Sequence, residues 1–355
     1  MQMTEPMKNG SKRSLTDMTG PMTTHAPPRG ADIALRPSVG EADLDRFVEI
    51  FTAANVADGV EERTTREALA NWMGHPRPSF DPERDVVVAE IDGVAVGYGW
   101  TSWVDTTDGG RDYSTRGHVH PSWRRQGVGT AILAHNEARL RELAAGHDTD
   151  RPRWYSGFGP DQRPGAVALL TRAGYRPVRW FFDMVRPTLD DIEVPELPTG
   201  IEIRPVAGRA QLRQLFDADV EAFADHWGGF DASDASFEQW LSDPDYDPVL
   251  FVVAWEGDEI AGAVVNVINE HENRELGRPR GLLDSVFVRR AWRGRGLGAA
   301  LVARSLVLLR ERGMTSAWLG VDADNPTGAL RLYEKAGFAV DHRGAAMHKP
   351  MEVDS

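Results

Sequence analysis

Apolar and polar positions follow the same order twice along the chain. In the first half, residues 34–39 alternate and end at a proline, which is typical of an edge strand, and residues 40–56 carry apolar side chains at helical spacing. Residues 85–100 predict a β-hairpin, because alternating apolar runs flank Asp92-Gly93, a dipeptide that favours tight turns. The pattern therefore predicts a strand, a helix and a hairpin, in that order.

A glycine-rich turn joins a strand to a helix after this hairpin. Residues 115–121 predict the strand, residues 124–129 (RRQGVG) the turn and residues 130–143 the helix. A further strand at 153–158 follows, and then a short helix that stops at Ala-Gly-aromatic, residues 173–175, since glycine commonly ends a helix. Strands and helices that alternate in this way predict an α/β fold on a mixed sheet.

The second half repeats these landmarks. The glycine turns begin at residues 124 and 293, 169 residues apart, and the glycines that end the late short helices, Gly174 and Gly337, are 163 residues apart. The corresponding segments of the second half are 201–206, 208–223, 249–265, 282–289, 293–298, 299–312 and 316–322. Landmarks that recur in order at nearly constant separation predict two copies of one domain.

The length of the chain is consistent with two domains. At roughly 100–200 residues per domain, 355 residues hold two units that can each bury a core. Residues 186–200 are rich in Pro and Asp and have the composition of a linker. We therefore expect a disordered tail at 1–30 (or an extension upstream of a later true start), a domain at 31–186, a linker at 187–200 and a second domain at 201–355.

The amino-acid composition of the chain excludes several classes of function. The formal net charge of -14 argues against a nucleic acid as the main partner, because phosphate binding needs a dense basic face. The chain has no cysteine, so disulfides, thiolate nucleophiles and cysteine-ligated zinc are excluded, and a reducing cytoplasm is the compartment that fits. No stretch approaches the roughly 18 consecutive apolar residues of a membrane span, so we expect no membrane partner.

The glycine turns predict an anion site. A strand, a glycine-rich turn and a helix N-terminus direct several backbone N–H groups to one point, and the helix dipole adds partial positive charge. Neither copy has the lysine of a Walker loop. Residues 294–299 match the dinucleotide pattern, but that pattern belongs after the first strand of a domain, and residues 127–132 do not match it.

The spacing Arg-x-x-Gly-x-Gly after a mid-domain strand resembles the coenzyme A loop of the GNAT superfamily of acyl-CoA N-acyltransferases. Both Arg124-x-x-Gly127-x-Gly129 and Arg293-x-x-Gly296-x-Gly298 fit it. Residues 322–338 (DADNPTGALRLYEKAGF) resemble the later Asn…Leu-Tyr…Gly-Phe segment of that family. The resemblance covers nearly all of residues 31–350 and implies two tandem GNAT domains, each a mixed, mostly antiparallel sheet flanked by helices.

This resemblance implies an N-acetyltransferase that uses acetyl-CoA and moves the acetyl group to a primary amine of a small molecule by direct attack. Backbone N–H groups of the strand around Phe287 or Val288 would polarise the thioester carbonyl. The positions that match the cofactor site are Phe287, Val288, Arg293, Gly294, Arg295, Gly296, Gly298 and Asn325 in the second half, and Val119, Arg124, Gly127 and Gly129 in the first.

Tyr333 is the candidate general acid. In the family a tyrosine commonly protonates the departing sulfur, and Tyr333 stands at the matching position, four residues before Gly337. The alternative is a tyrosine that only packs on an amphipathic helix. The first half has Leu170 at this position and Gln162 near the position of Asn325, so we expect a catalytic second domain and a degenerate first domain that completes the acceptor cleft or stabilises the fold.

Two carboxylates are candidates for handling the acceptor amine. Asp284 precedes the strand that would face the thioester and could relay an amine proton through water; otherwise it is an ordinary aspartate at a strand start. Glu221, with Asp225 and His226, lies where the family forms its acceptor site, so it could hold an ammonium, or it could be a solvated helix end. Trp227 and Phe230 form an apolar wall there, or belong to the core.

Other interpretations stay open at the level of sequence. His118 and His120 share one face of a strand, but no third metal ligand is visible, which favours structural histidines and no metal site. Acetylation of proteins or peptides and non-catalytic binding of an acyl-CoA are the alternative functions. The acceptor's identity is not encoded in these motifs, and either a monomer or a homodimer is consistent with them.

Overall fold

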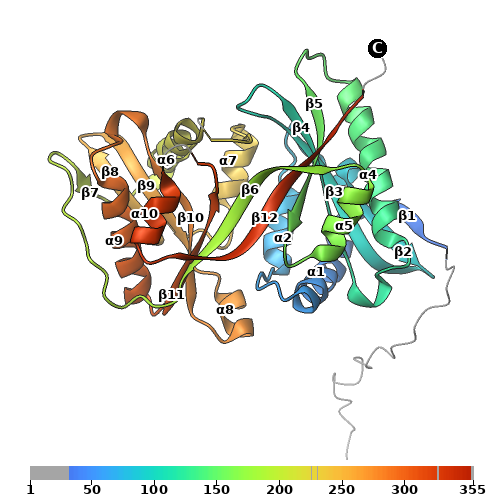
Figure 1. Cartoon of the computed structure of the whole chain (residues 1–355), viewed down its shortest axis with the longest axis horizontal. Helices are drawn as coiled ribbons and strands as arrows, with labels where there is room; N and C mark the ends of the chain where they lie inside the picture. Colours follow the sequence, from blue (N-terminus) through green and yellow to red (C-terminus); the bar gives the residue numbers. More distant parts are fainter. Residues whose placement is uncertain (1–31, 225, 230, 326–327, 353–355) are drawn as a thin grey trace, which may run out of the picture.

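The computed structural model describes residues 32–224, 226–229, 231–325 and 328–352 (Figure 1). The predicted disordered tail at 1–30 lies outside the described residues. No helix in the described part of the chain is long and apolar enough to cross a membrane.

The first half follows the predicted order with additional short helices. Its elements are β1 (Ala34–Pro37), η1 (Gly40–Asp43), α1 (Leu44–Asp58), α2 (Arg66–Gly74), α3 (Pro82–Asp85), β2 (Val86–Ile91), β3 (Val94–Asp105), β4 (Arg111–Val119), η2 (Pro121–Trp123), α4 (Val128–Ala145), β5 (Arg153–Pro160), α5 (Pro164–Arg172) and β6 (Arg176–Arg186). The turn between β2 and β3 has positive φ at both Asp92 (51°) and Gly93 (74°), as the Asp-Gly dipeptide predicts.

The second half repeats this order. Its elements are β7 (Glu202–Ile203), α6 (Gly208–Phe223), α7 (Asp234–Leu241), η3 (Pro248–Leu250), β8 (Val252–Glu256), β9 (Glu259–Val267), α8 (Glu270–Leu276), β10 (Arg280–Val288), η4 (Arg290–Trp292), α9 (Leu297–Glu311), β11 (Ser316–Asp322), α10 (Ala329–Lys335) and β12 (Ala339–Pro350). The sequence predicted one helix before each hairpin, and the structure adds α2 and α7. It also places the end of α8 and the start of β10 in the arginine-rich stretch 274–281.

The strands in the described part of the chain form one sheet of twelve in the order β1-β2-β3-β4-β5-β12-β6-β11-β10-β9-β8-β7. Two neighbouring pairs, β4 with β5 and β10 with β11, are parallel, and the other pairs are antiparallel. Each half is thus the mixed, mostly antiparallel sheet with flanking helices that was predicted, and the two halves share one continuous sheet.

The last strands of the two halves are exchanged. β12 pairs with β5 of the first half, and β6 pairs with β11 of the second half, while β6 and β12 also pair with each other. In Figure 1 these two long strands cross the middle of the molecule and join the halves. The division of the sequence at residues 187–200 stays a prediction, and in space each sheet continues into the last strand of the other half.

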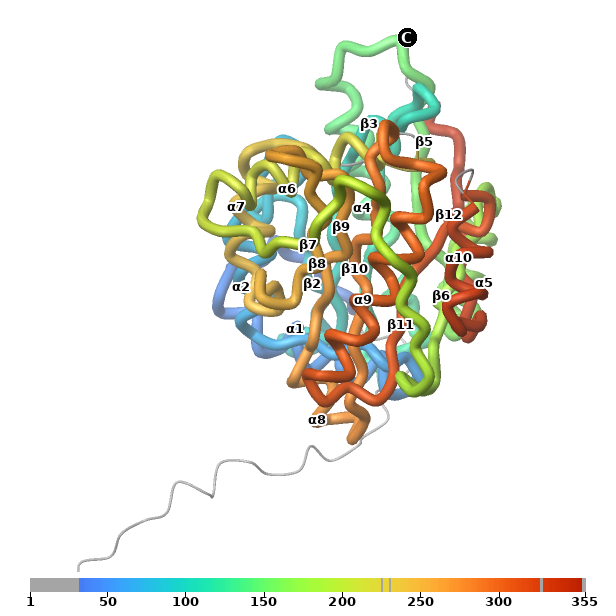
Figure 2. Tube along the Cα trace, turned by 90° about the vertical axis from the view of Figure 1, so that its left-hand side faces the viewer, coloured from blue at the N-terminus to red at the C-terminus, as the bar shows by residue number. Residues whose placement is uncertain are grey.

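Helices cover both faces of the sheet, as the side view also shows (Figure 2). In the second half, α9 and α10 pack on one face around Leu301 and Phe338, and α6 and α7 pack on the other around Phe216 and Trp255. The amphipathic spacing of α6 and the apolar runs of β8 and β9 produce these cores, because the apolar face of each helix packs against apolar side chains of the sheet. This layering fixes the turn before α9 next to the end of β10.

Candidate active site

The sheet opens between β10 and β11. The two strands pair only through residues 280–282 and 316–318, although β10 continues to Val288 and β11 to Asp322. A cleft of about 1220 Å³ occupies this opening, and its walls include the later parts of both strands, the N-terminus of α9, and α10. One edge of β10 therefore faces the cleft and not a neighbouring strand.

Two backbone N–H groups of β10 point into this opening. The N–H of Arg289 donates to the carbonyl oxygen of Ala261 on β9 at 3.0 Å, and in an antiparallel pair the hydrogen-bonding direction alternates between successive residues. The N–H of Phe287 therefore also points to β9, whereas those of Val286 and Val288 point to the cleft. Of the two predicted carbonyl-polarising donors, Val288 has the required direction, whereas the N–H of Phe287 is directed to β9. Phe287 still lines the cleft, so its contact with a cofactor stays a prediction. Val286 offers a second N–H that the sequence did not identify.

The glycine turn before α9 forms an open cradle of main-chain groups. Gly294 and Gly296 have φ values of 75° and 83°, which favour glycine, and a Cβ at either position would meet nothing within 4 Å. Together with Gly298 they line the cleft at the N-terminus of α9, where unpaired N–H groups and the helix dipole favour an anion. These residues fit the diphosphate of a nucleotide cofactor.

The two arginines of this turn do not share one role. Arg293 borders the cleft and donates to the carbonyl oxygens of Val288 at 2.9 Å and Ala222 at 3.1 Å, so it ties the turn to β10 and α6. Arg295 donates to the carbonyl oxygen of Thr199 at 3.1 Å and is not among the residues that line the cleft. The prediction that Arg295 contacts the cofactor is therefore not supported, because its side chain turns to the linker.

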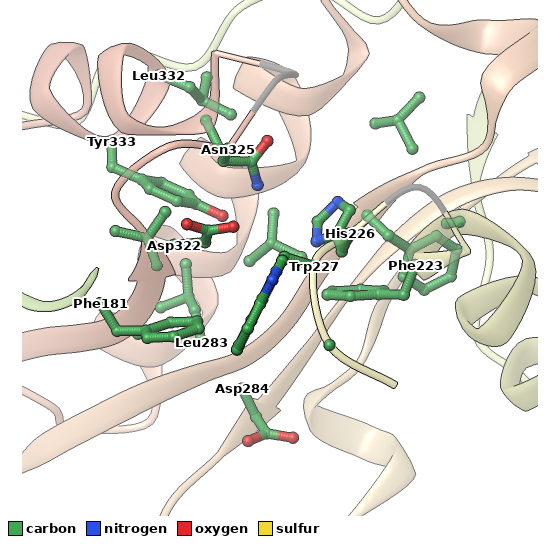
Figure 3. Close-up of a pocket in the computed structure, with 18 of the residues that line it drawn as sticks. Phe181, Phe223, His226, Trp227, Leu283, Asp284, Asp322, Asn325, Leu332 and Tyr333 are labelled. Atoms are coloured by element: carbon green, nitrogen blue, oxygen red, sulfur yellow. The ribbon is translucent and has the colours of Figure 1, made fainter. Parts of the chain in front are cut away.

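Tyr333 brings a phenol hydroxyl to the cleft. α10 buries its ring, which is 5% exposed and packs against Phe338, while the hydroxyl end points into the pocket near Trp227 and Asn325 (Figure 3). Burial raises the pKa of this phenol well above its ordinary value, so it stays protonated at neutral pH. Its oxygen has no hydrogen-bond partner in the described ranges. A protonated phenol with a free O–H is suited to donate a proton.

The turn from β11 to α10 forms the adjoining wall. Asp322 ends β11 and accepts two hydrogen bonds from the guanidinium of Arg179 on β6, at 2.8 and 2.7 Å. Asn325, a predicted cofactor residue, lines the cleft in this turn, and its N–H donates to the carbonyl oxygen of Asp322 at 3.1 Å. The exchanged strand β6 thus holds a part of the wall that faces Trp227.

Asp284 lies at the irregular step where β10 shifts its register against β9. The hydroxyl of Tyr246 donates to its Oδ2, and its side chain points away from Tyr333 (Figure 3). Although the side chain of Asp284 is exposed to the cleft, partial desolvation there raises the pKa of its carboxyl group, and the bond from Tyr246 opposes this only in part. Asp284 is two residues before Val286, about 7 Å along a strand. Asp284 also lines the cleft, so its carboxylate is within reach of an acceptor amine through a bridging water.

Glu221 does not line the cleft. Its carboxylate forms an ion pair with Arg289 at 2.7 Å, and its side chain is 53% exposed. The predicted role of Glu221 in holding the acceptor's ammonium group is therefore not supported by its position, which matches the alternative of a solvated helix end.

Sequence reasoning missed a second carboxylate beside Asp284, the half-buried Asp219. The hydroxyl of Ser285 donates to its Oδ1 at 2.6 Å, and burial, with repulsion from Asp284, raises the pKa of Asp219 to about 7. A signal was present in the sequence, because Asp219 follows Leu215 and precedes Ala222 at helical spacing and so lies on the apolar face of α6.

The first half supplies one wall of the cleft. β4 contributes Asp112 and Arg116, and β6 contributes Phe181 and Asp183. Oδ2 of Asp112 lies 3.0 Å from Nε2 of His348, while its Oδ1 is buried with no hydrogen-bond partner in the described part of the chain. The first half thus borders the cleft in the way expected of a domain that completes the acceptor site.

The segment 226–229 of the second half is fastened to the first half. The N–H of Thr107 donates to the carbonyl oxygen of Gly228 at 2.9 Å. A Cβ at Gly229 would lie 2.1 Å from the carbonyl oxygen of Asp105, so only glycine permits this close approach.

This fastened segment presents an aromatic side chain to the cleft. The ring of Trp227 lies 6.0 Å from that of Phe181 on β6, and His226 lines the same space. Both residues therefore stand where the acceptor wall was predicted. Asp225 and Phe230, which were expected beside them, lie outside the described residues.

The glycine turn of the first half has different surroundings. Arg124 forms an ion pair with Asp58 at 2.6 Å, and the Cδ1 atom of Ile33 lies 3.5 Å from the Cβ position of Gly127. Val119, Arg124, Gly127 and Gly129 do not line the cleft. Their predicted contact with a cofactor stays a prediction, and any such contact would belong to a separate site.

The first half also lacks an equivalent of the tyrosine. Leu170 occupies that place and packs so closely on β5 that a Cβ at Gly157 would lie 3.1 Å from its Cδ1. Gln162 donates to the carbonyl oxygen of Gly59 at 3.1 Å, and Arg163 donates to Asn55. These bonds tie the turn after β5 to the end of α1.

The strand histidines have structural surroundings. His118 is buried between the rings of Phe51 and Tyr98, and burial lowers its pKa to about 3. His120 accepts a hydrogen bond from the N–H of Ser122. Within the described ranges, no group of three or more His, Cys, Asp or Glu is placed to hold a metal ion.

Two family models match the chain, one in each half. The model described as "Acetyltransferase (GNAT) family" matches residues 211–338, and the model described as "Acetyltransferase (GNAT) domain" matches residues 82–177. The two matches cover both glycine turns, in agreement with the repeat.

Curated relatives align over most of the chain. A mycothiol acetyltransferase of Geodermatophilus obscurus is 30% identical over 301 residues, which is 84% of this chain and 91% of that protein. A mycothiol acetyltransferase of Nocardiopsis dassonvillei is 33% identical in an alignment that covers 84% of this chain and 92% of the relative.

Solved structures share the tandem architecture. A GCN5-related N-acetyltransferase from Sphaerobacter thermophilus is 29% identical with a TM-score of 0.65, and the match covers 91% of this chain and 96% of that one. A tandem GNAT protein from the clavulanic acid biosynthesis pathway, solved without AcCoA, also has a TM-score of 0.65 and covers 91% of this chain and 100% of its own. At 18% identity this second likeness concerns the fold alone.

Proposed function

We propose, from the premise that this chain belongs to the GNAT family of acetyltransferases, that its second half carries out the reaction and its first half completes the acceptor site. The chain is an N-acetyltransferase that moves an acetyl group from acetyl-CoA to an amine of a small molecule. One observation supports the assignment to the second half: the glycine cradle, the N–H of Val288 and the hydroxyl of Tyr333 all open onto one cleft.

The second-half cradle is suited to hold the cofactor. Acetyl-CoA, when bound, supplies the acetyl thioester. The N–H groups at 294–298 would hold its diphosphate, because Gly294 and Gly296 leave the space above the backbone open. Arg293 keeps this turn against β10, so the cradle and the free strand edge stay in fixed relation.

Proton positions in the cleft match direct transfer. The N–H groups of Val286 and Val288 would stabilise the negative charge that develops on the carbonyl oxygen. Asp284 would accept the proton that the attacking amine loses, and Tyr333 would donate a proton to the departing sulfur. As the N–C bond forms and the C–S bond breaks, Asp284 takes up one proton from the amine and Tyr333 gives one proton to the sulfur.

The nature of the acceptor follows from the relatives only in part. Both curated relatives described above are mycothiol acetyltransferases, so the acceptor of a mycothiol acetyltransferase is the specific candidate that the relationship offers. The absence of cysteine fits a protein of the reducing cytoplasm. Both a monomer and a homodimer remain consistent with the fold.

A screen of small amines with acetyl-CoA tests the proposed function. We expect free thiol to appear only when acetyl-CoA and a suitable amine are both present, with an acetylated amine as the second product in equal amount. Acetyl-CoA that binds, together with a broad amine panel that gives no thiol release, would favour a non-catalytic binding protein and contradict the proposal.

A further inference from the structure

A second cavity adjoins the cleft at Asp284. It encloses about 470 Å³ between the two halves, and Asp284 lines both spaces. The first half contributes Glu62, Trp72 and Trp100 to its walls, and the second half contributes Asp243, Asp245, Arg280 and Trp318. Two cavities that meet at one carboxylate suit a reaction in which two substrates approach each other.

Negative charge in this second cavity exceeds positive charge. Five carboxylates line it, against the guanidinium groups of Arg63 and Arg280. Arg280 is already engaged by Glu61 at 3.1 Å and Glu272 at 3.3 Å. The carboxylate of Glu62 has neither a hydrogen bond nor an ion pair with any residue that the structure describes. The other four carboxylates each accept at least one hydrogen bond, so Glu62 is the one whose charge a bound cation would compensate.

The titration of these carboxylates points the same way. Burial raises the pKa of Glu62, Asp243 and Asp245, and the neighbouring carboxylates Asp243 and Glu272 raise the pKa of Asp245 further. A bound positive charge would reverse part of these shifts, because it favours the ionised form of each group. Arg163 opposes the shift of Glu62 and hydrogen bonds oppose that of Asp243, so the protein itself compensates this charge only in part.

Aromatic faces complete the cavity. The ring of Trp72 stands at 67° to that of Trp100 with centroids 5.3 Å apart. On the opposite wall the guanidinium of Arg280 lies 5.2 Å from the ring centroid of Trp318, so this wall already accepts one cation. Arg280 is 8% exposed, and its Nε has no hydrogen-bond partner in the described ranges. Indole faces with nearby carboxylates are suited to an ammonium group with an apolar stem.

We propose that this second cavity receives the acceptor, and that the acceptor carries a second cationic group besides the amine that is acetylated. The inference rests on the proposed function. The second cation would lie among Glu62, Asp243 and the tryptophans, and the reacting amine would reach past Asp284 into the cleft. There the amine forms its bond to the acetyl carbon, its proton passes to Asp284, and the thiolate leaves with the proton of Tyr333.

Paired amines test this inference. The probes are α,ω-diamines of increasing length and the monoamines of equal length, each assayed for kcat/KM with acetyl-CoA. We expect the best diamine to exceed its monoamine by at least about tenfold, since one lost charge-assisted contact costs about that much in affinity. Glu62→Gln and Asp243→Asn should lower this ratio by about tenfold, mainly through KM for the diamine.

A matched control separates local from general charge effects. Glu275 is exposed on α8 and does not line the cavity, so Glu275→Gln changes the net charge equally and should leave the ratio unchanged. Thermal unfolding of each variant checks that the fold is intact. Diamines and monoamines that react equally well, with no effect of Glu62→Gln, would overturn the inference while the proposed function stands. Failure of every amine to react would instead contradict the proposed function.

Discussion

Desolvation sets the protonation of single residues in and beside the cleft. Tyr333 is kept neutral, and the carboxyl groups of Asp284 and Asp219 have raised pKa values. A neutral phenol and a carboxylate of raised basicity have the two properties that proton transfer from an amine to a departing thiolate needs. Proton donation to the thiolate and proton removal from the amine therefore depend on side chains from different elements, α10 and β10.

Replacing Tyr333 by phenylalanine should slow turnover without abolishing cofactor binding. Tyr333→Phe removes only the hydroxyl, which has no partner in the described ranges, so the fold should keep its stability. We expect kcat to fall by about 100-fold or more, the usual range for a general acid, with little change in the affinity for acetyl-CoA. Steady-state thiol release and calorimetry measure the two quantities. An unchanged kcat would show that another group donates the proton.

Asp219 should make stability depend on pH. Its pKa of about 7 lies above the value of about 3.8 in an unfolded chain, so its contribution is fully present below pH 3.8 and is lost as the pH rises toward 7. Asp219→Asn keeps an acceptor for Ser285 and removes this ionisation. We expect the stability of the variant relative to the wild type to increase by about 2 kcal/mol between pH 5 and pH 8, measured by urea unfolding. A constant difference would contradict the raised pKa.

Among residues, the sequence predicted those that belong to local motifs. The glycines of the second turn and Tyr333 stand in the cleft, because their spacing along the chain fixes their place on strand, turn and helix. Glu221 and Arg295 do not, since long side chains on exposed positions take whichever ion partner is nearby. Asp112 could not be predicted, because its place in the cleft wall depends on pairing between the halves.

At the scale of elements, one strand–turn–helix unit occurs twice with different surroundings. Both turns place glycine with positive φ before the helix, at Gly127 and Gly296. Ile33 approaches the first, whereas nothing lies within 4 Å of a Cβ at the second. The backbone geometry is shared, and the neighbouring residues decide which copy can accept a ligand.

A matched pair of substitutions tests which turn binds acetyl-CoA. Gly298 and Gly129 occupy the same second position of α9 and α4, and a Cβ would lie 3.4 Å from Leu332 in one and 3.3 Å from Leu169 in the other. An aspartate near a helix N-terminus is favourable for the helix but repels a diphosphate. Gly298→Asp should therefore weaken acetyl-CoA binding by about tenfold or more, measured by calorimetry.

Gly129→Asp is the control for this pair. It should leave both acetyl-CoA affinity and turnover near those of the wild type. Equal losses in the two variants would show that the first turn also binds the cofactor, as the sequence motif alone predicted.

At the scale of the whole molecule, the two halves depend on each other's last strand. β12 separates β5 from β6, and β6 separates β12 from β11, so neither half closes its own sheet. The cleft wall formed by Phe181 and Asp183 belongs to β6, a strand of the first half that pairs with the second. The exchange of the last strands therefore joins the two sheets and also supplies a wall of the cleft.

Separated halves should be unstable alone and stable together. A fragment of residues 1–200 lacks β12, and a fragment of residues 201–355 lacks β6, so each exposes an unpaired strand edge. We expect each fragment to aggregate or unfold when expressed alone, and the coexpressed pair to form a 1:1 complex with one cooperative thermal transition. Size-exclusion chromatography and calorimetry measure both. A monomeric, cooperatively folding 201–355 fragment would contradict the dependence.

The repeat and the class of fold were predictable, whereas the exchange was not. Periodicity and turn residues are local, and they predicted the hairpin at Asp92-Gly93 and both glycine turns. β6 and β12 have equivalent places in their repeats, and either sheet could pair with either strand. Only the three-dimensional packing of the two halves decides between these pairings.

The exchange also has a consequence for biosynthesis. β5 ends at Pro160, and its native neighbour β12 begins only at Ala339. At translation rates of roughly 5–20 residues per second, roughly 10–40 s pass before the ribosome has made that neighbour. During this interval the nascent amino-terminal half carries an incomplete sheet, so its escape from aggregation depends on chaperones or on slow, posttranslational closure by the final strand.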